Sequence, residues 1–109
     1  ALSNSQVVSA TSYGANGTIT NPTVNTTIFI DKATACALTL TDPAADQTNT
    51  VIIKSLTAAA HTVTYATGFY GDTTSSDVAT FAAKAGASMT IVARNGKWTP
   101  LALANVTLA

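Results

Sequence analysis

The chain has 109 residues, enough for one domain with a buried core and too few for two. Five Lys and Arg residues balance five acidic residues, so the formal net charge is zero. The charges are spread along the chain and leave no basic surface for nucleic acid or an anionic membrane. No apolar run approaches the roughly 20 residues that a membrane-spanning helix needs.

Thr and Ala together make up roughly two fifths of the chain, whereas charged residues make up only 9%, well below the usual share of about a quarter. A surface so poor in charge is tolerated when a partner covers much of it, or when hydroxyl groups form the polar face of strands. Both explanations favour an assembled structural protein.

Apolar and β-branched residues alternate with polar ones between short turn clusters, a pattern typical of strands. The first half of the chain predicts strands over 6–12, 17–20, 26–31, 35–41, 50–55 and 61–67. In the third of these, Ile28 and Ile30 share one face and Phe29 takes the other. In the fourth, Cys36 alternates with Leu38, which predicts a small buried hydrophobe; this single cysteine leaves the fold without an intrachain disulfide.

The segment 68–78, GFYGDTTSSDV, is the longest turn-rich stretch, and we expect it to project with Phe69 and Tyr70 exposed. The following segment 79–88 has the Ala content of a helix, but its length and Gly86 limit it to a short helical turn.

Strands over 89–93 and 97–103 flank Asn95-Gly96, a dipeptide that strongly predicts a hairpin because both central residues take a positive φ. A last short strand is expected near 105–109. Trp98 follows the turn. We expect it to pack on the end of the core with its indole N–H paired, and we favour this role over that of an exposed stacking residue. Arg94 and Lys97 are then solvated turn charges or contacts to a partner.

No arrangement of residues indicates catalysis. Asp72 and Asp77 could hold a hard cation, but they lack the repeated acidic ligands of a calcium loop. His61 has no second His with which to build a zinc site and is expected to be a hydrogen-bonded structural residue. We therefore predict no enzyme activity, no catalytic or metal-binding residues and no cofactor.

The region from Leu38 to Trp98 resembles a pattern found in bacteriophage virion proteins, both fibre β-modules and small capsid decoration (cement) proteins. The resemblance is carried by LTLTDPAADQTN, by TVIIKSLTAAAHTVTYATG and by AGASMTIVARNGKW. It implies a structural role without catalytic residues. Small single-domain chains of this kind are decoration proteins, which commonly form trimers on the capsid and sometimes use an extended N-terminal arm.

We therefore expect an all-β fold, a single-domain β-sandwich or partly closed antiparallel barrel over 13–109, with an extended N-terminal arm over 1–12. The expected function is a virion protein on the capsid surface, made in the host bacterial cytoplasm, that stabilises the shell. Its partners are then the major capsid protein and itself, as a homotrimer, with no nucleic acid and no membrane. The candidate contact residues are Val7, Val8, Phe69, Tyr70, Arg94 and Lys97.

The alternative function is a phage tail fibre or spike tip module that binds a host-surface glycan. In that case Phe69, Tyr70 and Trp98 would be the stacking residues.

Overall fold

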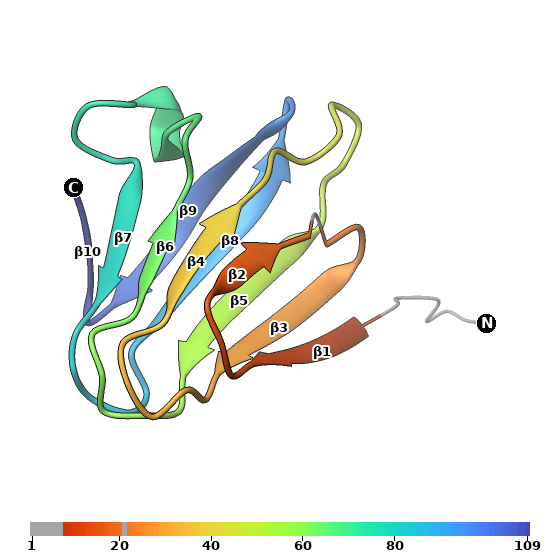
Figure 1. Ribbon diagram of the computed structural model, residues 1–109. Helices are drawn as coiled ribbons and strands as arrows, with labels where there is room; N and C mark the ends of the chain where they lie inside the picture. Colours follow the sequence, from red (N-terminus) through yellow and green to blue (C-terminus); the bar gives the residue numbers. More distant parts are fainter. Residues whose placement is uncertain (1–7, 21) are drawn as a thin grey trace.

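A computed structural model describes residues 8–20 and 22–109, and within them ten strands form two five-stranded sheets (Figure 1). The first sheet has the order β1-β3-β5-β8-β9 and the second has the order β10-β7-β6-β4-β2. The strands are β1 Val8–Tyr13, β2 Gly17–Ile19, β3 Asn25–Ile30, β4 Ala37–Leu40, β5 Thr50–Ser55, β6 Thr62–Thr64, β7 Val78–Phe81, β8 Ser88–Arg94, β9 Lys97–Ala104 and β10 Val106–Leu108. A short 3-10 turn, η1 Phe69–Gly71, lies between β6 and β7.

The chain alternates between the two sheets over its first six strands. Strands β1, β3 and β5 pair in parallel in one sheet, and β2, β4 and β6 pair in parallel in the other. The later strands add antiparallel pairs to both sheets. The all-β prediction is confirmed, and the architecture is a sandwich of two mixed sheets rather than a closed barrel.

The core lies between the sheets and is filled by alternate residues of nearly every strand. Ile28 and Ile30 are buried while Phe29 between them is only half-buried, as the alternation predicts. Cys36 and Leu38 are buried in the same way. Because the residues between these positions point outward, each strand contributes one apolar face to a shared core.

The segment 79–88 was expected to form at most a helical turn, and this prediction is wrong for its first part. Residues Val78–Phe81 form β7, which pairs antiparallel with β6 on one side and β10 on the other. Ala79 and Phe81 are fully buried. Strand pairing on both sides and burial of these two side chains outweigh the helix preference of the alanines in this segment.

Hydroxyl groups form the outer face of the second sheet. One cross-strand row joins Thr18, Thr39 and Thr64, and a second row joins Thr62, Thr80 and Thr107. These side chains are exposed or half-buried. Threonine therefore supplies the polar face that charged residues provide in most sheets, as the composition suggested.

The expected N-terminal arm over 1–12 falls into two parts. Residues 1–7, and with them Val7, lie outside the described residues, as does the side chain of Val8. Residues 8–12 belong to β1, which pairs with β3 from Val8↔Asn25 to Tyr13↔Ile30. The described part of the arm is thus an edge strand of the first sheet.

Candidate functional site

The β8–β9 hairpin turn has the geometry that Asn95-Gly96 predicts. Arg94 pairs with Lys97 across the turn, and the two residues between them have φ values of 53° and 75°. Both positive φ values are required by the tight turn that matches the strand twist. The turn therefore holds the two cationic side chains at one end of the sandwich (Figure 1).

Trp98 is a core residue, which confirms the structural prediction. Its side chain is fully buried, and its indole Nε1–H donates to the carbonyl of Thr41 over 2.8 Å. Its backbone N–H donates to the hydroxyl of Tyr65 over 3.2 Å, and that hydroxyl donates to the Asp42 carboxylate over 2.6 Å. These bonds fix the base of the hairpin against the ends of β4 and β6. Burial, followed by the bond to Asp42, raises the pKa of Tyr65 to about 12.

The two aromatic residues of the 68–78 segment differ sharply in exposure. Phe69 was expected to be exposed, but its side chain is fully buried, with its ring centroid 5.2 Å from that of Tyr65. The N–H of Phe69 donates to the carbonyl of Ser76 over 2.8 Å, so the segment folds back and turns this ring inward. Tyr70 is 63% exposed, which confirms the expectation for this residue.

Asp72 forms its hydrogen bonds within the same loop. Its carboxylate accepts hydrogen bonds from the N–H and the hydroxyl of both Thr74 and Ser75, at distances of 2.6 to 3.1 Å. These bonds, led by that from the Ser75 hydroxyl, hold the pKa of Asp72 far below its usual value. Within the described part of the chain, no group of three or more His, Cys, Asp or Glu residues could hold a metal ion.

Three of the predicted contact residues meet at one hollow, here called the end groove. Tyr70, Arg94 and Lys97 line it together with Gly71, Asn95, Trp98 and Thr99, and it has a volume of about 390 Å³. The two charged side chains that line it are both cationic, and neither has a hydrogen-bond or ion-pair partner among the described residues. Two cations without counter-charges can bind carboxylate groups, and the exposed phenol hydroxyl beside them can donate a hydrogen bond.

Sequence reasoning named these three residues but did not place them together. Tyr70 belongs to η1 and the two cations to the β8–β9 turn, and η1 packs against β9. No local pattern predicts that contact, because it depends on how the two sheets stack.

His61 has the structural role that was expected. Its side chain is fully buried, and Nδ1 accepts a hydrogen bond from the backbone N–H of Cys36 over 3.0 Å. Since Nδ1 is an acceptor, the proton of the neutral ring is on Nε2, which donates to the Thr57 hydroxyl over 2.8 Å. That hydroxyl in turn donates to the carbonyl of Lys32. Burial, with a smaller effect of the Lys32 charge, lowers the pKa of His61.

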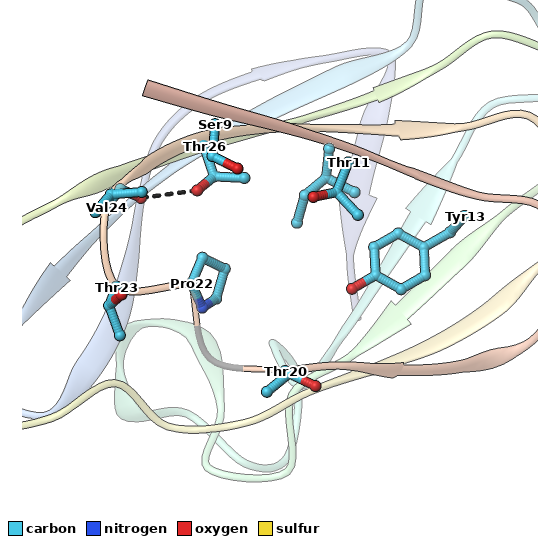
Figure 2. A pocket seen from close by; sticks show the side chains of 9 residues that line it. Ser9, Thr11, Tyr13, Thr20, Pro22, Thr23, Val24 and Thr26 are labelled. Atoms are coloured by element: carbon cyan, nitrogen blue, oxygen red, sulfur yellow. Dashed lines mark hydrogen bonds between the residues drawn. The ribbon is translucent and has the colours of Figure 1, made fainter. Parts of the chain in front are cut away.

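A second hollow, the side hollow, opens between the inner face of the first sheet and residues 20 and 22–24 (Figure 2). It has a volume of about 340 Å³ and is lined by Ser9, Thr11 and Tyr13 of β1, by Thr20, Pro22, Thr23 and Val24, and by Thr26 and Ile28 of β3. It contains no charged side chain. Sequence reasoning missed it, because hydroxyls at inward positions of an edge strand read as ordinary polar residues.

No helix in the described ranges, 8–20 and 22–109, is long and apolar enough to cross a membrane. Comparison with protein-family models, with curated proteins and with solved structures finds no match to this chain.

Proposed function

We propose that this chain is a structural virion protein that binds the outside of a phage capsid as a decoration protein, with the end groove as its contact with the major capsid protein. The observation that carries this assignment is the meeting of Tyr70, Arg94 and Lys97 around one hollow. Both cations lack partners within the described chain, and the tyrosine is 63% exposed. Exposed tyrosine and arginine are residue types that concentrate binding energy at protein interfaces.

The rest of the surface supports a mechanical role. The hydroxyl rows of the second sheet and the low overall charge fit a protein whose surface is covered by neighbouring subunits in a regular assembly. A decoration protein acts by holding neighbouring shell subunits together. Many copies in a symmetric array give a stable coat even when each contact is modest.

Co-sedimentation with capsids that lack this protein tests the proposal. We expect the wild-type chain to bind, and the double variant Arg94→Glu with Lys97→Glu to lose about tenfold or more in affinity, because like charges then face the carboxylates of the shell. The matched control is Lys84→Glu, an exposed lysine on the β7–β8 connection at the opposite end of the sandwich (Figure 1). No binding of the wild-type chain to such capsids would contradict the proposal.

A further variant, Tyr70→Ala, addresses the fibre-tip alternative. Of its three stacking residues, Phe69 and Trp98 are fully buried and only Tyr70 is available to a ligand. Binding to a host glycan that is lost in Tyr70→Ala, without binding to capsids, would replace the decoration role by the glycan-binding role.

A further inference from the structure

The four sheet edges differ in how well they are protected against pairing with another chain. Edges β2 and β10 have only three residues each. Edge β9 contains Pro100, and its pairing with β8 has a register shift between Thr90 and Ile91. Short edges, proline and bulges are the usual means of preventing strand addition.

Edge β1 carries none of these protections. It has six residues, VSATSY, without charge or proline, and its register with β3 is regular throughout. Among the described strands it is therefore the edge on which another strand can add without obstruction.

The backbone direction of β1 follows from one hydrogen bond. The carbonyl of Tyr13 accepts from the N–H of Asp31, the residue directly after β3, so Tyr13 directs its backbone groups toward β3. Directions alternate along a strand, so Thr11 also faces β3. Ala10 and Ser12, and the backbone of Val8, then direct their N–H and C=O groups outward, away from the sheet.

The inner face of β1 is polar and borders the side hollow. Ser9, Thr11 and Tyr13 lie beside Thr26, Ile28 and Ile30 of β3, and they border the side hollow (Figure 2). Their hydroxyls, and those of Thr20 and Thr23, have no hydrogen-bond partner among the described residues, whereas Thr26 donates to the carbonyl of Val24. A strand added beside β1 would place its own inner-face side chains next to these hydroxyls, so the edge suits an uncharged, hydroxyl-bearing strand.

We propose that the β1 edge binds a second copy of the chain, whose β1 pairs antiparallel with β1 around a twofold axis at Ala10. In that register Ala10 pairs with Ala10 of the second copy, and Ser12 with Val8 of the second copy. Every outward backbone group of β1 from Val8 to Ser12 is then used. Ser9 lies opposite Thr11 of the second copy on the inner face, where the two hydroxyls can bond to each other.

The absence of charge on β1 favours pairing with a second copy over pairing with a charged strand of another protein. Because β1 carries no charge, the twofold register brings no like charges together, whereas a foreign charged strand would find no opposite charge on this edge. The pair joins the first sheets of both copies into one continuous sheet. This contact lies away from the end groove and does not depend on capsid binding.

A cysteine cross-link tests the register directly. The Cα atoms of a hydrogen-bonded antiparallel pair lie about 5.5 Å apart, within the range of about 4.4–6.8 Å that a disulfide spans. Under mild oxidation we expect Ala10→Cys to form a covalent dimer. The matched control Thr80→Cys, on the exposed face of the second sheet, should stay monomeric, and the buried Cys36 is present in both. Equal cross-linking of the two variants would contradict the register.

Native mass spectrometry of the full chain provides the second test. We expect a dimer for the wild type and for Ala10→Thr, which keeps the outward N–H. Ala10→Pro removes that N–H and leaves the bonds of Ser9 and Thr11 to β3 in place, so it should be a monomer that still unfolds cooperatively. A wild-type monomer, a dimer that persists in Ala10→Pro, or the trimer expected from the resemblance to decoration proteins would each overturn the twofold pair.

Discussion

At the scale of single residues, His61 links three segments through its neutral form. Its ring joins Cys36 to Thr57 at the end of the sandwich opposite the hairpin turn. Protonation would place a hydrogen on Nδ1 against the N–H of Cys36 and would put a charge in a buried site near Lys32. The folded state therefore disfavours the imidazolium form.

This predicts a loss of stability in mild acid. Because the folded-state pKa of His61 lies below the ordinary histidine value of 6.5, the unfolded chain binds the proton first as the pH falls. The contribution is fully present above about pH 6.5 and is lost as the pH falls through that value. Urea unfolding at about pH 8 and about pH 5 should show a lower free energy of unfolding in acid.

The variant His61→Gln isolates this effect, because its amide can accept and donate without titrating. We expect it to be less stable than the wild type at about pH 8 but to change less between the two pH values. An equally steep pH dependence in the variant would assign the acid effect to other groups.

Trp98 and the two turn cations should differ in their effects on stability. Trp98→Ala removes a fully buried side chain and the bond to Thr41, and should cost about 3–5 kcal/mol of unfolding free energy. Arg94→Ala and Lys97→Ala remove exposed side chains without partners and should change stability by less than about 0.5 kcal/mol. Thermal melts of the three variants check this, and a wild-type melting temperature for Trp98→Ala would show that the indole is not a core residue.

At the scale of elements, two glycines of the η1 loop both have a positive φ, but only one of them lies too close to the backbone to accept a side chain. Gly68 and Gly71 have φ values of 88° and 73°. A Cβ at Gly68 would lie 2.4 Å from the backbone of Asp72, whereas a Cβ at Gly71 would meet nothing within 4 Å.

Replacing each glycine by alanine should therefore give different losses of stability. Gly71→Ala should cost about 1–2 kcal/mol, from the positive φ alone. Gly68→Ala should cost a further ~1–3 kcal/mol, because the backbone of Asp72 must move. Urea unfolding of both variants measures the difference, and equal losses would mean that the loop adapts to the added methyl group.

The sequence predicts individual elements well where polar and apolar residues alternate regularly. It predicts them poorly where they depend on contacts between residues far apart in the sequence. Strands β3, β4 and β5 and the Asn95-Gly96 turn follow from local patterns, because one face of each strand is buried and the turn needs two positive φ values. Strand β7 and the inward turn of Phe69 were missed. Both depend on neighbours that the local sequence does not specify, namely β10 and the ring of Tyr65.

At the scale of the whole molecule, the strand order was beyond the reach of local patterns. Parallel pairs such as β1 with β3 need a crossover, and here the crossover is a strand of the other sheet. The lengths of these connections vary, so no repeat period reveals the arrangement. The same stacking brings Tyr70 to Arg94 and Lys97, which explains why the sequence named these residues without showing that they form one site.

The two proposed contacts of the molecule should respond differently to salt. The end groove presents two cations, so its attraction to carboxylates weakens as the Debye length falls from about 10 Å at ~0.1 M salt to about 3 Å at ~1 M. The β1 edge is uncharged and pairs through backbone hydrogen bonds, which salt screens little. Capsid co-sedimentation should therefore decline over this range, while the dimer fraction from sedimentation velocity stays constant. Capsid binding that is insensitive to salt would move the shell contact from the end groove to the hydroxyl rows of the second sheet, and a dimer that dissociates in salt would show that charged residues outside β1 hold the two copies together.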